Sequence, residues 1–193
     1  MNDELRGGFP VEIANRRHNR KVNQALCAAI EAIIPKSAFV VDMGSSAYGQ
    51  HVRWMRENGW GDAHGIDASP DAHKSSGGTV TVGNLTTPNI CQSLFQRLPD
   101  WIVFSEVGEH VPGRFEKELF DNLAAAQRGV LISWATAGRD GHEHVNCRIP
   151  EWVACEMGRV GFQLNEQATL AIREGTSRFL RRRIMVFTKK GIE

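Results

Sequence analysis

Two carboxylates and an imidazole stand close together near the middle of the chain, in Glu106-Val107-Gly108-Glu109-His110. Two more histidines, His142 and His144, follow in a polar loop. Carboxylate oxygens and imidazole nitrogens suit magnesium, manganese or zinc, so this set predicts a divalent metal site. The same residue types also suit proton transfer, because an imidazole that a carboxylate orients can act as a general base.

Three alternatives for these residues stay open from the sequence. In the first, the two glutamates, His110 and one later histidine hold a metal ion that lowers the pKa of a substrate hydroxyl. In the second, no metal is involved: His110 or His144 is the base, and the glutamates orient it or bind the substrate. In the third, Glu106 and Glu109 only bind a cofactor or cap the helix that is expected to begin near Pro112.

The elements that must position these residues follow from the hydrophobic pattern. Short apolar runs alternate with segments of helical periodicity. The runs lie at residues 38–41, 64–67, 79–82, 100–105 and 129–134, and two more, at 162–166 and 183–188, follow a last helix. Repeated strand–helix units with a terminal hairpin predict an α/β fold. We expect a Rossmann-like, doubly wound, mostly parallel sheet of seven strands that ends in an antiparallel hairpin.

The N-terminal part of the chain adds one helix before this sheet. Apolar residues between Arg20 and Ile34 fall at helical spacing, and Pro35 ends the helix. We expect a single domain over residues 1–193, with a lid segment and this helix in residues 1–35 and the Rossmann-like core in residues 38–189. In such a sheet, the turns at the carboxyl ends of the strands meet in one crevice. The residues after the fourth and fifth strands should therefore lie near the turn after the first.

That first turn reads Asp42-Met43-Gly44-Ser45-Ser46-Ala47-Tyr48-Gly49. Its glycines let backbone N–H groups approach a ligand. A dinucleotide site would carry G-x-G-x-x-G and a phosphate, which Asp42 would repel. A carboxylate in the turn instead suits an ammonium group, and S-adenosylmethionine has an ammonium group and no phosphate. The turn therefore favours S-adenosylmethionine over NAD, the alternative being an ordinary turn that binds nothing.

A second acid ends the next predicted strand, at His64-Gly65-Ile66-Asp67. In nucleoside-binding folds an acid at this place binds the ribose hydroxyls. The alternative is that Asp67 caps the following helix. Together with Asp42, it indicates a nucleoside ligand.

With these residues in place, the chain resembles the class I S-adenosylmethionine-dependent methyltransferases over about Ala38 to Lys189. The resemblance implies that Asp42 to Gly49 form the cofactor loop and that Asn84-Leu85 contact adenine. The full cofactor-binding set that it implies is Asp42, Gly44, Ser45, Gly49, Asp67, Ala68, Asn84, Leu85 and Ser105. Two departures from the family pattern stand out: Ser46 replaces the second glycine, with one extra residue before Gly49, and Asn84 replaces a more usual Asp.

The E-x-x-E-H sequence resembles that of the ubiquinone-biosynthesis O-methyltransferases and of the small-RNA 3′-terminal 2′-O-methyltransferases, in which these positions bind metal. The segment Gly141 to Asn146 is similar to that of a small methyltransferase-like subgroup whose likeness names no substrate. These resemblances imply that Glu106, Glu109, His110 and His144 are both the catalytic residues and the ligands of magnesium, manganese or zinc.

Composition bears on the substrate and the location. The chain has 23 basic and 22 acidic residues, a net charge of +1, and its arginines are not interleaved with aromatic residues. A nucleic-acid partner is therefore less favoured than a small molecule. There is no apolar segment typical of export or of a membrane span, so we expect a cytoplasmic protein. The expected function is O-methylation of a small-molecule hydroxyl. The alternatives are RNA 2′-O-methylation, S-adenosylmethionine binding or scaffolding without catalysis, and NAD-dependent oxidoreduction.

Overall fold

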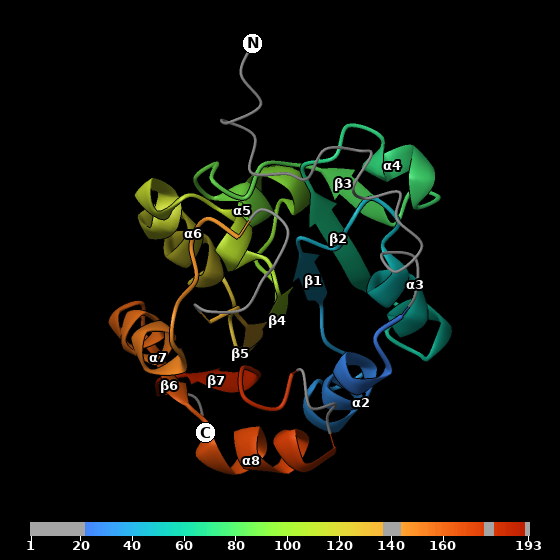
Figure 1. Cartoon of the computed structure of the whole chain (residues 1–193). Coiled ribbons are helices and arrows are strands. Elements are labelled where there is room, and N and C mark those ends of the chain that lie inside the picture. The colour runs from blue at the N-terminus through green and yellow to red at the C-terminus, as the bar shows by residue number, and fades with distance from the viewer. Residues whose placement is uncertain (1–21, 137–143, 176–179, 192–193) are drawn as a thin grey trace.

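The structure is a computed structural model, and it describes residues 22–136, 144–175 and 180–191. In these residues one seven-stranded sheet forms, with the order β3-β2-β1-β4-β5-β7-β6 (Figure 1). The strands are β1 (Val40–Met43), β2 (Ala63–Asp67), β3 (Val80–Val82), β4 (Trp101–Ser105), β5 (Gly129–Ser133), β6 (Phe162–Leu164) and β7 (Met185–Lys189). β1 to β5 run parallel, and β7 is antiparallel to both β5 and β6. The expected fold class is confirmed.

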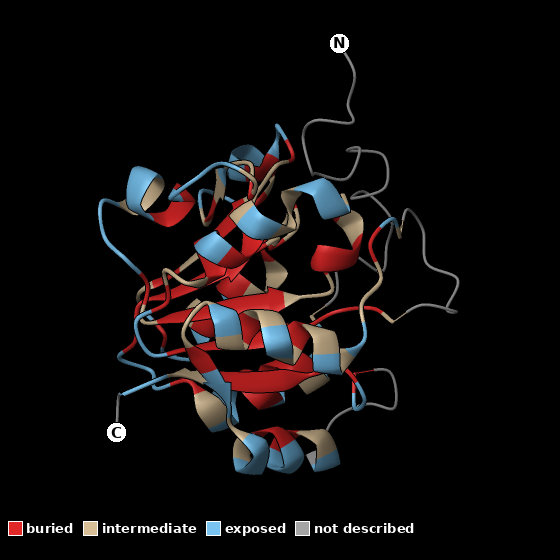
Figure 2. Cartoon of the chain, turned by 90° about the vertical axis from the view of Figure 1, so that its left-hand side faces the viewer, coloured by how far each residue is buried: buried red, intermediate tan, exposed pale blue. Residues whose placement is uncertain are grey.

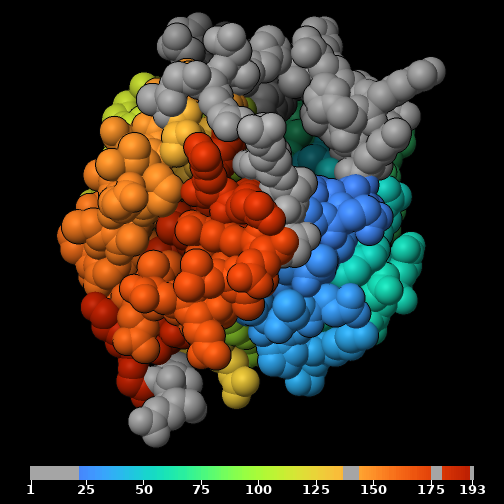
Figure 3. Space-filling view, turned by 60° about the horizontal axis from the view of Figure 1, so that its bottom comes forward, coloured from blue at the N-terminus to red at the C-terminus, as the bar shows by residue number. Residues whose placement is uncertain are grey.

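Helices cover both faces of this sheet (Figure 1). One face carries α2 (Gln24–Ile33), α3 (Gln50–Glu57) and α8 (Glu166–Gly175), and the other carries α5 (Ile90–Phe95), α6 (Glu116–Leu123) and α7 (Pro150–Arg159). Alternate residues of β1 enter the two cores, Val40 on the first face and Val41 on the second, as the two-residue period of a strand requires. Figure 2 shows the strands buried and the outer faces of the helices exposed. The space-filling view places α8 beside α2 (Figure 3).

The element boundaries differ from the predictions at several places. α2 begins at Gln24 because Asn23 caps it, its side chain accepting hydrogen bonds from the N–H groups of Ala25 and Leu26. Between the second and third predicted strands the chain forms the short helix α4 (Ala72–Ser75). The last strand, predicted at 183–188, is β7 at Met185–Lys189. The predicted strand 162–166 ends at Leu164, and α8 begins two residues later. The predicted lid in residues 1–20 lies outside the described residues.

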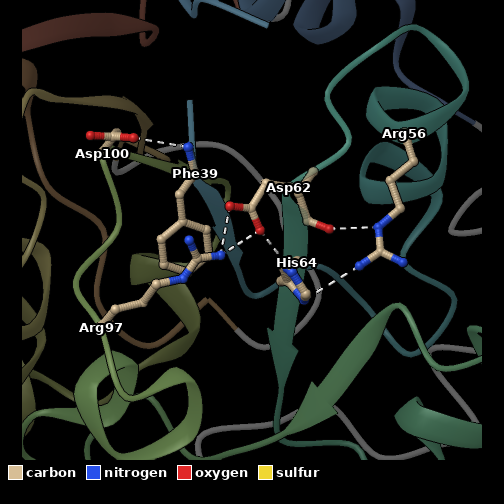
Figure 4. Close-up of polar contacts among 7 residues, drawn as sticks. Phe39, Arg56, Asp62, His64, Arg97 and Asp100 are labelled. Carbon is tan, nitrogen blue, oxygen red and sulfur yellow. Dashed lines mark hydrogen bonds and ion pairs between the residues drawn. The ribbon is translucent and has the colours of Figure 1, made fainter. Parts of the chain in front are cut away.

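A polar cluster joins the amino ends of three neighbouring strands (Figure 4). Arg97 donates to Asp62, just before β2, at 2.6 Å, and its guanidinium lies 3.7 Å from the centroid of the Phe39 ring, just before β1. Asp100, just before β4, accepts from the N–H of Phe39 at 2.9 Å. The ring of His64 packs between Asp62 and the aromatic rings of this cluster. These contacts hold the amino ends of β1, β2 and β4 in register with one another. The relative positions of their carboxyl ends follow from that register.

Every helix among residues 22–136, 144–175 and 180–191 is too short or too polar to cross a bilayer.

Candidate cofactor and catalytic site

A cavity of about 200 Å³ opens at the carboxyl ends of β1, β2 and β4. Strand order reverses between β1 and β4, which is where ligands bind in open α/β sheets. Seven of the nine residues predicted to bind cofactor line it: Asp42, Gly44, Ser45, Asp67, Ala68, Leu85 and Ser105. The other two, Gly49 and Asn84, are not part of its wall. The side-chain oxygen of Asn84 instead accepts hydrogen bonds from the N–H and hydroxyl of Thr86, which shapes the turn after β3.

The turn after β1 shows how the chain does without the second glycine of the family pattern. Ser46 adopts φ 60°, the left-handed conformation that glycine takes most easily. Its hydroxyl donates to Gln50 at 2.7 Å and accepts from the N–H of Tyr48, and these bonds offset the backbone strain. Gly44, at φ 81°, must be glycine, because a Cβ there would overlap with the side chain of Val107.

Asp42 presents an unpaired carboxylate to this cavity. Its side chain is 3% exposed, and its Oδ2 atom has no hydrogen-bond partner among the described residues. Burial, with a smaller effect from the carboxylate of Asp67, raises the pKa of Asp42 to about 7. A buried carboxylate without a partner is costly unless a cation or a donor binds to it. Asp42 could therefore accept a positively charged group or a hydrogen-bond donor of a ligand.

Asp67 and its neighbours form the next part of the wall. The Oδ1 atom of Asp67 accepts from the N–H of Ser69 at 2.9 Å, which holds the carboxylate in the turn after β2. Ala68 and Leu85 line the cavity beside it. An acid next to small and apolar side chains can bind the hydroxyls of a ribose and the face of its base.

Glu109, His110 and His144 come together at the carboxyl ends of β4 and β5. One potential ligand atom from each residue lies within 4.8 Å of the others. The rings of the two histidines are 5.0 Å apart between centroids. The backbone explains the meeting, because the carbonyl of Glu109 accepts from the N–H groups of Val145 and Asn146 at 2.8 and 3.0 Å. His110 also lines the cavity, whereas His142 lies outside the described residues.

Glu109 is fully buried, and neither of its carboxylate oxygens has a hydrogen-bond partner in the described part of the chain. Burial and the nearby carboxylate of Glu106 raise the pKa of Glu109 to about 8, although the backbone N–H groups of Glu109 and Ala135, which lie near the carboxylate but outside hydrogen-bond geometry, and the charge of Arg183 oppose this rise. A carboxylate with two unpaired oxygens beside two imidazoles fits a divalent cation, since these are the donor types that such ions bind.

Glu106 does not join these three residues. Its backbone has φ 55°, and its Oε2 atom accepts a hydrogen bond from Nη1 of Arg183 at 2.6 Å. Arg183 is the last of three consecutive arginines, and its residue type does not distinguish it from Arg181 and Arg182 as the one that turns inward. The only sequence signal is that Arg183 directly precedes the apolar residues of the last strand.

Two further residues take positions that the hydrophobic pattern does not indicate. Trp134 is buried in the core: it stacks on Phe120 and donates from Nε1 to the carbonyl of Asn146 at 2.7 Å. Through this hydrogen bond, Trp134 anchors the backbone of the segment after His144 to the core. His51 lies on the wall of the cavity. It stands at the start of a helix, where no periodicity marks a ligand-facing side chain.

No protein-family model and no curated protein matches the sequence. Solved structures do match. A TehB-like S-adenosylmethionine-dependent methyltransferase from Corynebacterium glutamicum aligns with 93% of this chain and 97% of its own, at a TM-score of 0.69 and 19% identity. The sugar N-methyltransferase from a Streptoalloteichus species aligns with 98% of this chain and 95% of its own, at a TM-score of 0.68 and 12% identity.

A third match is magnesium protoporphyrin IX methyltransferase from Synechocystis, solved with bound S-adenosylhomocysteine. It aligns with 86% of this chain and 81% of its own, at a TM-score of 0.64 and 15% identity. Two of these names give a substrate, a sugar in one and magnesium protoporphyrin IX in the other, and the fold is common to all three. This chain has the Rossmann-like fold of the class I S-adenosylmethionine-dependent methyltransferases.

Proposed function

We propose that this protein is an S-adenosylmethionine-dependent methyltransferase that methylates a hydroxyl group of a small molecule. The observation that carries the proposal is that one cavity is lined by the unpaired acid Asp42, by Asp67 and by His110. A cofactor held by the two acids would share its cavity with an imidazole. The fold, which is that of methyltransferases, supports the same reading.

The residues present fit the cofactor. Asp42 would hold the ammonium group, Asp67 the ribose hydroxyls, and Leu85 the adenine. When bound, S-adenosylmethionine supplies a methyl group on a positively charged sulfur. The chain's own task is to align an acceptor oxygen with that methyl group and to exclude water, and orientation of this kind carries much of the rate of such reactions.

The cluster of Glu109, His110 and His144 would activate the acceptor hydroxyl. Two imidazoles and one carboxylate suit manganese or zinc better than magnesium, which prefers oxygen ligands. A cation bound there would lower the pKa of the hydroxyl. Without a cation, His110 takes the proton directly, because it is the member of the cluster that reaches the cavity. Glu106, a predicted ligand, is engaged by Arg183, so we assign the site to the other three residues.

The surroundings of the cluster favour a small organic substrate over RNA. Val145 and Ile149, on either side of the segment that follows His144, are 63% and 57% exposed. Exposed apolar side chains close in the chain to His144 favour an apolar molecule, whereas an RNA backbone requires a basic surface. The near-zero net charge of the chain agrees with this choice.

The test is made in two steps with the purified protein. Calorimetry should detect S-adenosylhomocysteine binding, and Asp67→Ala should weaken it at least about tenfold, since a ribose would lose its charged acceptor. Transfer of a labelled methyl group is then measured on pools of small-molecule alcohols and phenols and on RNA, with and without a chelator. Absence of binding contradicts the proposal. Binding without transfer to any pool supports a non-catalytic protein, and transfer to RNA alone supports the RNA alternative.

A further inference from the structure

His51 is a wall residue of the cavity for which the proposed reaction has no use. It is the second residue of α3, and it lines the cavity together with Asp42, Gly44 and Leu26. Its Nε2 atom lies 3.1 Å from the backbone nitrogen of Asn23, the residue that caps α2. The ring is thus held between the start of one helix and the start of another.

The contact with Asn23 fixes which ring nitrogen carries the proton. A backbone N–H can only donate, so Nε2 of His51 must accept, and the single proton of the neutral ring stands on Nδ1. Burial lowers the pKa of His51 to about 4, so the ring is neutral at physiological pH. Across the described residues, Nδ1 has no hydrogen-bond partner. His51 therefore brings to the cavity wall a neutral ring whose Nδ1–H donor has no acceptor among the described residues.

Several polar side chains of the wall are poorly suited to an anion. Asp42, Asp67 and Glu106 are carboxylates and repel one. The hydroxyl of Ser45 donates to the carbonyl of Ile66, and that of Ser46 donates to Gln50. The amide of Gln50 and the hydroxyl of Ser69 also line the wall and can donate. The Nδ1–H group of His51 differs from them because the contact with Asn23 holds its ring in place, and it stands in the first turn of α3, where the helix dipole and the backbone N–H groups also favour negative charge.

We propose that the Nδ1–H group of His51 binds the carboxylate of the amino-acid part of the cofactor at the start of α3, while Asp42 binds its ammonium group. The negative charge of the amino acid then faces the N–H donor of His51, and its positive charge faces the acid Asp42, on the same wall of the cavity. This assignment rests on the proposed function, since it specifies how the same cavity holds its cofactor.

The test compares two ligands that differ only in this amino-acid part. S-adenosylhomocysteine carries it, and 5′-methylthioadenosine lacks it. By calorimetry, His51→Leu should weaken S-adenosylhomocysteine binding about tenfold to a hundredfold, the effect of one hydrogen bond to a charged group, and leave 5′-methylthioadenosine binding within about threefold. Asp67→Ala should weaken both ligands. His73→Leu, at an exposed histidine, is the matched control and should change neither.

Two polar variants separate ligand binding from the contact with Asn23. The amide nitrogen of asparagine takes the place of Nδ1, and the amide oxygen of glutamine can take the place of Nε2. His51→Asn should therefore bind S-adenosylhomocysteine better than His51→Gln. The reverse order, or an equal loss for both ligands in His51→Leu, overturns the assignment alone. A wild-type protein that binds neither ligand overturns the proposed function and the assignment with it.

Discussion

Nη1 of Arg183 lies 2.6 Å from Oε2 of Glu106, although the two residues are 77 positions apart in the chain. Arg183 is 3% exposed, so this is a buried ion pair. It ties the chain just before β7 to the turn that follows β4. It also holds a positive charge next to two carboxylates, those of Glu106 and Glu109, whose mutual repulsion it reduces.

Replacing Arg183 by methionine should lower the free energy of unfolding by roughly 3–5 kcal/mol, because Glu106 is left partly buried without its counter-charge. Urea denaturation at pH 7 measures this loss. The exposed neighbour Arg182 provides the control, and Arg182→Met should change stability by less than about 0.5 kcal/mol. Equal effects of the two substitutions would contradict a structural role for the pair.

Gly44→Ala should destabilise the protein by about 2 kcal/mol or more. The new methyl group would overlap with Val107, and φ 81° is unfavourable for alanine. Gly61→Ala is the matched control, since a Cβ there meets nothing within 4 Å. Thermal unfolding of the two variants gives the comparison. A melting temperature for Gly44→Ala equal to that of the control would show that the turn after β1 adapts.

The raised pKa of Asp42 predicts how stability depends on pH. The folded chain keeps the Asp42 proton up to about pH 7, whereas the unfolded chain releases it near pH 4. Stability therefore falls as pH rises between these values, because the folded state binds more protons. Asp42→Asn removes this loss and should be more stable than the wild type at pH 8, by roughly 2–4 kcal/mol, with little difference at pH 4.

Urea denaturation of both proteins at the two pH values measures the difference. Part of the pH dependence should remain in Asp42→Asn, because the pKa of Glu109 is raised to about 8 for the same reason. A stability difference that is the same at pH 4 and pH 8 would show that Asp42 is not protonated in the folded state.

The three-residue cluster predicts which glutamate a metal ion requires. Cobalt(II) binding, followed by its visible absorption, should be weakened by about tenfold to a hundredfold or more in Glu109→Gln, which loses a ligand. Glu106→Gln should bind cobalt within about threefold of the wild type, because Glu106 lies outside the cluster. If the wild type shows no cobalt spectrum, the metal-free base is the better assignment for His110.

Much of the fold could be predicted because its signals are local. A buried strand such as Phe104 and its neighbours is a short apolar run, and the acids Asp42 and Asp67 stand where such runs end. The order of strand and helix then places these ends at one edge of the sheet. Of the predicted pair Asn84-Leu85, Leu85 lines the cavity and Asn84 does not.

Side-chain direction could not be predicted in the same way. Whether Glu106 turns towards Glu109 or towards Arg183 depends on its left-handed backbone and on a residue 77 positions away. The place of Trp134 in the core depends on its contact with Phe120 and on the absence of a side chain at Gly108. His51 reaches the cavity wall because α2 and α3 begin next to each other. Hydrophobic periodicity does not indicate any of these contacts.

The acidic side chains at the two ends of the parallel strands differ in whether they are paired. At the amino ends, Asp62 is paired with Arg97 and His64. At the carboxyl ends, Asp42 and Glu109 have unpaired oxygens within the described chain. Engineering for higher melting temperature can therefore add charge pairs around Asp62 without reaching the cavity at the other end of the strands. Giving Asp42 a charged partner within the chain would also stabilise the protein, but that partner would occupy the cavity that Asp42 lines.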